Sequence, residues 1–308
     1  MLYRCRDRWD LPTPVAGVAE MKPLSVLAVA MALLTIPAVA RAAGPINVVA
    51  AENFYGDVAR RIGGADVKVT SILNNPDQDP HLFEVSPSVA RAISRARIVI
   101  YNGIGYDPWM ARLLRATHGA GRRTIVVADL VGGKVGDNPH IWYDPETMVA
   151  AAKALAADLG DADPAHRADY QARLVKFVRS LRPVEDRIAA MRHRLAGTPV
   201  TATEPIFGYM FKALGMRVRN QAFQLAVMNN TEPSASAIAA FERDLKTGRV
   251  KLMVYNSQVS DPTADRMEKI ARASHVPVVG ATETQPPGKS YQVWMLDELK
   301  AIDLALSE

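Results

Sequence analysis

The sequence predicts an α/β fold of two Rossmann-like lobes, each with a parallel sheet, joined by one long linking helix. Short β-branched runs alternate with amphipathic stretches, a pattern typical of parallel sheets covered by helices. Eight such runs fall into two groups of four, separated by one long helical segment. We therefore expect strands at Ile46–Ala50, Val67–Leu73, Arg97–Tyr101, Thr124–Ala128, Pro199–Thr203, Met216–Gln221, Val250–Tyr255 and Pro277–Gly280.

The amphipathic stretches between these runs are expected to form the covering helices. Several begin with proline, which is favoured in the first turn because its missing N–H would have no partner there. The clearest are Pro87–Arg95, Pro108–Thr117, Ser234–Leu245 and Pro262–Ala273.

The segment between the two groups of strands is predicted to be one helix from Pro164 to Leu195, spanning roughly 45 Å. Pro183 lies inside it and predicts a bend, because proline removes a backbone donor. Dimerisation as a coiled coil is the alternative, but the opposite face is rich in Arg and Lys without matching acids. The apolar residues alternate four and three positions apart and so share one stripe: Tyr170, Leu174, Phe177, Leu181, Val184, Ile188, Met191 and Leu195.

Residues 1–43 are predicted to be a signal peptide with an upstream extension. Pro23–Ala40 carries no charge, Lys22 precedes it, and Ala40-Arg41-Ala42 places small residues where a signal peptidase reads. An uncleaved membrane anchor is the alternative, although the stretch is short for a stable span. Translation could start at Met1 or at Met21. We expect the first lobe over residues 44–160, the linking helix over 161–196 and the second lobe over 197–308.

The composition is that of an ordinary globular protein and excludes several classes. Of the 308 residues, 49% are hydrophobic and 22% charged, which argues against disorder, collagen-like repeats and a protein with many membrane spans. The net charge is +5, without the Lys/Arg runs typical of nucleic-acid binding. The one cysteine, Cys5, precedes the expected cleavage point. We therefore expect no disulfide, catalytic thiol, thiolate metal site or cysteine-linked lipid anchor in the exported chain.

Residues that can bind a metal follow four of the predicted strands. In open α/β sheets, ligands bind beyond the carboxyl ends of the strands. His81 and His140 follow strands of the first half, and each comes directly after a proline. Glu204 and Glu283 follow strands of the second half. Two imidazoles and two carboxylates suit a first-row divalent cation, so we predict a metal site in the cleft between the lobes. The other histidines are expected at structural or surface positions: His118, His166, His193 and His275.

Two segments, Asp79–Pro87 and Asn138–Pro145, resemble the two histidine motifs of the periplasmic metal-binding proteins of zinc and manganese ABC transporters. The resemblance covers residues 46–307. It implies a bilobal fold with a rigid linking helix and one buried four-ligand site between the lobes. It also implies a monomeric periplasmic protein that delivers Zn²⁺ or Mn²⁺ to a membrane permease with a cytoplasmic ATPase.

The same resemblance implies a set of metal ligands. His81 and His140 match the first two, and Glu204 matches the third, which is histidine in typical zinc carriers and glutamate in typical manganese carriers. The fourth is usually an aspartate after the last strand; Glu283 is nearest here, with Asp261 as the alternative. The histidine-rich loop that precedes the second histidine in many zinc carriers is absent. Zinc and manganese therefore both stay open.

A secreted metal-dependent hydrolase on the same scaffold is the main alternative function. A catalytic metal keeps an open coordination position and a nearby general base. Four protein donors can close the shell here, and the sequence has no H-E-x-x-H, G-x-S-x-G or paired-carboxylate motif. We therefore expect a binding protein and not an enzyme. A surface adhesin role, in addition to metal capture, would use the same fold and site.

Overall fold

The computed structural model describes residues 44–77, 80–117, 119 and 121–307, and of His81 only the backbone. The predicted signal peptide and its upstream extension, residues 1–43, lie outside the described residues, as does His118. Within the described part of the chain, no helix combines the length and the apolar character that a membrane span requires.

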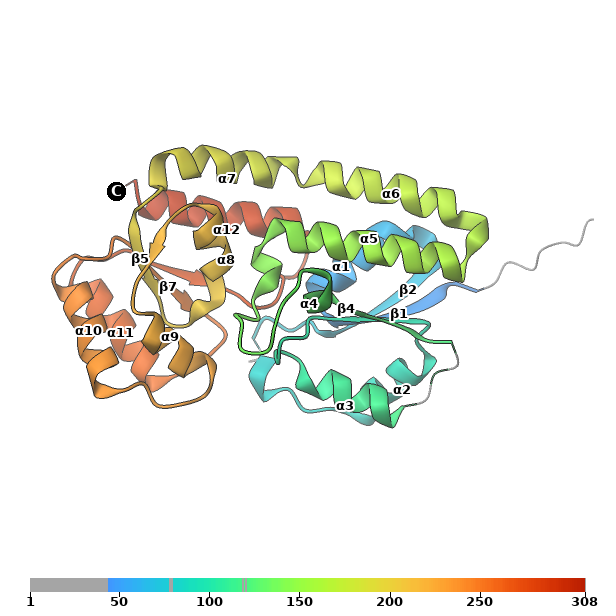
Figure 1. The fold of residues 1–308 in the computed structure, drawn as a ribbon, viewed down its shortest axis with the longest axis horizontal. Coiled ribbons are helices and arrows are strands. Elements are labelled where there is room, and N and C mark those ends of the chain that lie inside the picture. The colour runs from blue at the N-terminus through green and yellow to red at the C-terminus, as the bar shows by residue number, and fades with distance from the viewer. Residues whose placement is uncertain (1–43, 78–79, 118, 120, 308) are drawn as a thin grey trace, which may run out of the picture. The chain divides into compact units, whose positions relative to one another are not determined.

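Two four-stranded sheets with all strands parallel form the centre of the fold (Figure 1). The first sheet has the order β2-β1-β3-β4 and the second the order β6-β5-β7-β8, so both halves have the same topology. The predicted α/β class with two parallel sheets is therefore confirmed. The strands are β1 Ile46–Glu52, β2 Val67–Leu73, β3 Ile98–Tyr101, β4 Arg123–Val126, β5 Pro199–Ala202, β6 Arg217–Val218, β7 Met253–Asn256 and β8 Val278–Ala281.

Helices cover both sheets, and in Figure 1 α1 and α5 lie above the first sheet while α2 and α3 lie below it. The α-helices are α1 Asn53–Gly63, α2 Pro87–Arg95, α3 Pro108–Ala116, α4 Val127–Leu130, α5 Pro145–Ala162, α6 Arg167–Ser180, α7 Arg182–Leu195, α8 Gly208–Ala213, α9 Gln221–Met228, α10 Ala235–Lys246, α11 Pro262–Ala273 and α12 Tyr291–Ala305. Short 3₁₀ turns are η1 Gly64–Asp66, η2 Pro80–Leu82, η3 Ile141–Tyr143, η4 Pro164–His166 and η5 Pro205–Phe207.

The segment predicted as one linking helix consists of a 3₁₀ turn followed by two α-helices, α6 and α7. The break lies at Leu181, two residues before Pro183, which takes a place in the first turn of α7 where its missing N–H costs nothing. Leu181 keeps a helical backbone (φ −81°, ψ −17°), so α6 and α7 lie end to end in Figure 1. In place of the predicted bend within one helix, the structure therefore has a break between two helices. The apolar stripe faces the core, with Tyr170, Val184 and Met191 fully buried.

Five strands of the structure are shorter than predicted, β3, β4, β5, β6 and β7, and β7 begins at Met253 instead of Val250. The reasons are clearest at β4 and β6. Thr124–Ala128 was expected as a strand, but β4 ends at Val126 and the following residues form α4. Met216–Gln221 reduces to the two residues of β6, because Asn220 adopts a left-handed conformation (φ +60°) and α9 begins at Gln221. β6 lies at a sheet edge and pairs only with β5, so few hydrogen bonds extend it.

One apolar core runs through both halves of the described chain. It joins Val48 of the first sheet to Val254 of the second through buried aromatic residues that include Trp142 and Trp294. A smaller cluster around Phe223 and Phe241 lies under α10 and α11 in the second half. The two sheets are therefore packed onto a shared core, and the carboxyl ends of β5, β7 and β8 come close to the segment that follows β4.

Candidate metal centre

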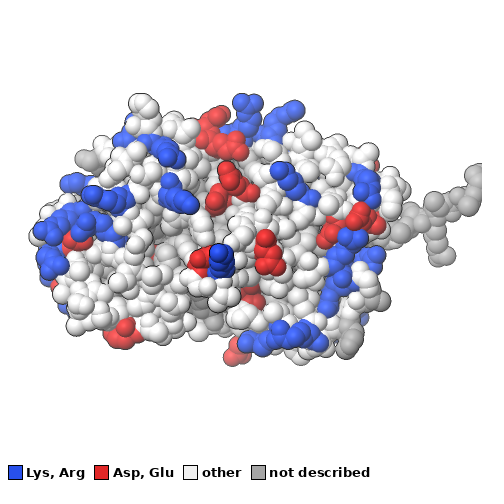
Figure 2. All heavy atoms as spheres, in the orientation of Figure 1, with Lys and Arg blue, Asp and Glu red and all other residues white. Residues whose placement is uncertain are grey.

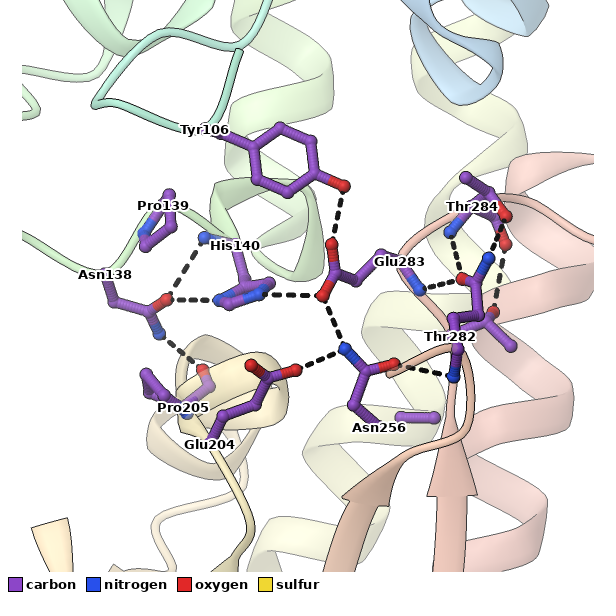
Figure 3. Close-up of polar contacts among 12 residues, drawn as sticks. Tyr106, Asn138, Pro139, His140, Glu204, Pro205, Asn256, Thr282, Glu283 and Thr284 are labelled. Carbon is purple, nitrogen blue, oxygen red and sulfur yellow. Dashed lines mark hydrogen bonds and ion pairs between the residues drawn. The ribbon is translucent and has the colours of Figure 1, made fainter. Parts of the chain in front are cut away.

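Three buried side chains from separate segments converge where the two halves meet: His140, Glu204 and Glu283 (Figure 3). They are 0%, 2% and 0% exposed. One ligand atom from each lies within 4.8 Å of the others. Because carboxylates are costly to bury without a positive partner, this group has the composition expected of a cation site.

Asn138 orients the ring of His140. The Oδ1 atom of Asn138 accepts hydrogen bonds from Nδ1 of His140 at 2.7 Å and from the His140 backbone N–H at 3.1 Å. The amide is itself fixed, because its Nδ2 donates to the Pro205 carbonyl at 2.6 Å. Since an amide oxygen only accepts, the ring proton is on Nδ1 and the lone pair is on Nε2.

The Nε2 atom of His140 points into the cluster. It lies 3.7 Å from Oε1 of Glu283 and has no hydrogen-bond partner among the described residues. Buried polar atoms in this state are rare. A histidine whose other nitrogen is bound to a fixed amide is the usual arrangement of a metal ligand.

The loop that carries His140 is held from several sides. Asn102 donates from Nδ2 to the Pro139 carbonyl at 2.8 Å, and the Tyr209 hydroxyl donates to the Asn138 carbonyl at 2.8 Å. Gly208 passes so close that a Cβ there would lie 2.9 Å from Nδ2 of Asn138. A larger residue at position 208 would therefore displace the amide that orients His140.

Glu204 lies two residues beyond the end of β5 and directly before η5, with an extended backbone (φ −148°, ψ 171°). β7 pairs with β5, so Asn256 at the end of β7 lies beside it. Nδ2 of Asn256 donates hydrogen bonds to Oε1 of Glu204 and to Oε1 of Glu283. One amide thus bridges the two carboxylates (Figure 3).

Glu283 lies in the loop after β8. Its backbone N–H and that of Thr284 both donate to Oε1 of Gln258, at 2.6 and 2.9 Å, which fixes the loop. The Tyr106 hydroxyl, from the first half of the chain, donates to Oε2 of Glu283 at 2.7 Å. Burial, and then the charge of Glu283, raise the pKa of Tyr106, so its hydroxyl keeps the proton that it donates.

The other predicted site residues are placed as follows. The backbone of His81 forms part of η2, and its side chain is outside the described atoms. Asp261, the alternative fourth ligand, caps α11 instead: its Oδ1 accepts from the Ala264 N–H at 2.7 Å. The side chains of His166, His193 and His275 are exposed.

Residues 48–305 match the model of one protein family, described as "ZnuA: Zinc-uptake complex component A periplasmic". The chain belongs to this family. Its members are substrate-binding proteins of metal ABC transporters and not enzymes, which confirms the expectation of a binding protein.

A curated relative and two solved structures share the same framework. The metal ABC transporter substrate-binding lipoprotein ScbA of Streptococcus cristatus is 22% identical over 284 residues, covering 85% of this chain and 89% of ScbA. The periplasmic zinc binding protein TroA from Treponema pallidum has a TM-score of 0.71 at 18% identity, covering 86% of this chain and 99% of TroA. The SBP FpvC from Pseudomonas aeruginosa, in complex with Mn²⁺, has a TM-score of 0.70 at 19% identity, covering 85% and 98%. These likenesses confirm the two-lobed fold.

The residues that support this candidate site are not predicted from the sequence. Asn138 lies in one of the two histidine motifs, but the motif predicts no role for it, and the sequence predicts none for Tyr106 or Asn256. A usable signal existed for Asn256, because it ends β7 at the same sheet edge as Glu204. The contact of Tyr106 with Glu283 is not predictable from sequence patterns, because it joins residues 177 positions apart.

Proposed function

We propose that this protein captures one divalent transition-metal ion, Zn²⁺ or Mn²⁺, outside the inner membrane and delivers it to the permease of an ABC importer. The observation that carries the proposal is the buried convergence of His140, Glu204 and Glu283. Nε2 of the histidine points into this group and has no hydrogen bond to any described residue. Membership of a family of metal ABC transporter substrate-binding proteins supports the role in transport.

The proposed ligands are His81, His140, Glu204 and Glu283. Three of them supply the cluster, and His81 completes a set of two nitrogen and two oxygen donors. His81 lies in η2, in the loop between β2 and α2. It therefore comes after the carboxyl end of a strand of the first sheet, which is where ligands bind in open α/β sheets.

The ion is proposed to be zinc or manganese. Imidazoles suit zinc well, and carboxylates also suit manganese, which takes more oxygen donors. Because affinities generally rise from manganese to zinc along the Irving–Williams order, we expect zinc to bind more tightly in the test tube. Selectivity in the cell then depends on shell geometry and on which ion is available.

The protein is proposed to act as a monomer in the periplasm after removal of residues 1–43. The apolar stretch and the Ala40-Arg41-Ala42 sequence support export and cleavage. The proposal includes a first lobe over residues 44–160, a linking segment over 161–196 and a second lobe over 197–308. The proposed partners are the membrane permease and its cytoplasmic ATPase.

Metal content and calorimetric titration test this function. We expect protein purified from its own periplasm to contain one zinc or manganese ion per chain by mass spectrometry. In titrations of metal-free protein, His81→Ala and His140→Ala should weaken binding far more than His193→Ala, the matched control with an exposed histidine. Equal effects of the three substitutions would rule out the proposed site.

A further inference from the structure

Asn256 uses both hydrogens of its amide on the two candidate ligand carboxylates. It is 5% exposed, and its Nδ2 donates to Oε1 of Glu204 and Oε1 of Glu283. The orientation of the amide is fixed independently, because its Oδ1 accepts from the Gln258 backbone N–H at 3.0 Å. An amide turned the other way would set its oxygen against two carboxylates and its NH₂ group against an N–H.

Tyr106 holds the remaining oxygen of Glu283. Its hydroxyl donates to Oε2 at 2.7 Å, while Asn256 donates to Oε1, so both oxygens of this carboxylate accept a hydrogen bond from a buried donor (Figure 3). Tyr106 is 6% exposed, and its ring lies against Trp142 with centroids 4.9 Å apart. Turning Glu283 to present both oxygens to one ion would therefore strain or break two hydrogen bonds that water cannot replace.

The same constraint applies to Glu204 through Asn256. One amide connects both carboxylates, so a rotation of either side chain changes the hydrogen bond to the other. The carboxylates thus behave as a coupled pair with a preset orientation. Preset orientation of ligands by hydrogen-bonded neighbours is a general means of tuning a metal site.

We propose that Asn256 and Tyr106 are positioning residues that limit Glu204 and Glu283 to one metal-bound oxygen each. With two imidazoles, this gives a shell of four donors, which zinc favours as a tetrahedron, whereas harder ions favour more oxygens. The site is therefore selective for Zn²⁺ over Mn²⁺ beyond the general order of affinities. This inference rests on the proposed function, because it takes the two glutamates as ligands.

The test is a competition titration of the full chain with Zn²⁺ and Mn²⁺ against a chelator of known affinity. We compare wild type with Asn256→Ala, Asn256→Asp and Tyr106→Phe, and use Asn229→Ala, at an exposed position, as the control. Loss of a residue that orients metal ligands typically costs about 10- to 100-fold in metal affinity. We expect Asn256→Ala to lower the zinc-to-manganese affinity ratio by about 10-fold or more, because zinc binding weakens more than manganese binding.

Asn256→Asp and Tyr106→Phe should move the ratio in the same direction, and the control should not move it. They also provide independent tests if Asn256→Ala does not fold. Zinc-edge X-ray absorption should show four donors in wild type and more in the Asn256 variants.

The two proposals fail in different ways. A ratio that stays unchanged in the folded variants, with metal still bound, overturns the positioning role alone. A wild-type chain that binds neither ion overturns the proposed function instead.

Discussion

The orientation of single side chains decides what the site can bind. His140 presents Nε2 because Asn138 holds Nδ1, and Glu283 is fixed by Tyr106 and Asn256. Glu204 accepts a hydrogen bond from the same Asn256 amide, so its carboxylate is oriented together with that of Glu283.

Glu204→His tests the role of this residue in metal choice. A histidine replaces an oxygen donor with a nitrogen donor, which suits zinc in a tetrahedral shell better than it suits manganese. We expect the zinc-to-manganese affinity ratio to rise in competition titrations. An unchanged ratio would mean that Glu204 does not bind the metal and that the third donor lies elsewhere.

The strand and helix ends contain a second buried acidic pair, Glu52 at the end of β1 and Asp107 before α3. Glu52 is 0% exposed and Asp107 is 1% exposed. Asp107 accepts from the backbone N–H groups of Asn102 at 2.7 Å and Gly103 at 2.9 Å, and so holds the turn before α3. Asn102 in turn donates to the carbonyl of Pro139, the residue before His140. The acidic pair therefore stabilises the loop that carries this candidate ligand.

Burial, and then the negative charge of Asp107, raise the pKa of Glu52 well above its usual 4.5. Burial likewise raises the pKa of Asp107 to about 6. A carboxyl whose pKa is higher in the folded state binds more protons there than in the unfolded state. Its effect on stability is therefore increasingly unfavourable as pH rises above the unfolded value.

Glu52→Gln should remove most of this pH dependence. We expect the variant to unfold at a higher temperature than wild type at pH 8. The difference should shrink toward pH 4.5, where the carboxyl is protonated in the folded state and about half protonated in the unfolded state. Thermal unfolding across this pH range measures the effect, with Glu146→Gln, an exposed position, as the control. If the unfolding temperatures of wild type and Glu52→Gln changed with pH in the same way, the raised pKa of Glu52 would be contradicted.

Sequence patterns predicted elements well where local preference and burial agree. The bounds of β2, α2 and α11 are those expected, because each has flanking signals such as Pro87 and Pro262 at the helix starts. The patterns predicted the wrong bounds where the conformation of a connecting segment limits the element. At β6, for example, the left-handed conformation of Asn220 ends the β-branched run. The contacts of Tyr106 and Asn256 could not be predicted from the sequence, because they depend on which loops meet after folding.

The whole described molecule shares one apolar core across its two sheets, with α12 packed along α7. Figure 2 shows Asp and Glu side chains gathered mainly along the middle of one face, and Lys and Arg mainly toward its two ends. Lobes that share a core should resist the wide closure seen in proteins whose lobes are joined only by flexible strands.

Metal binding should therefore further restrict the loops that carry His81 and Glu283, with little motion of the lobes. Small-angle scattering of the metal-free and zinc-bound protein should give the same radius of gyration within error. Hydrogen exchange should show protection concentrated in these two loops. A clear compaction on binding zinc would contradict a shared, rigid core.

The central claim is that His81, His140, Glu204 and Glu283 together bind one ion. The most direct measurement is a crystal structure of the zinc-bound protein with anomalous diffraction at the zinc edge. The account predicts one strong peak per chain, with two imidazole nitrogens and two carboxylate oxygens about 2.0–2.2 Å away. A peak elsewhere, or a peak at this place without His81 or Glu283 among its ligands, would contradict it.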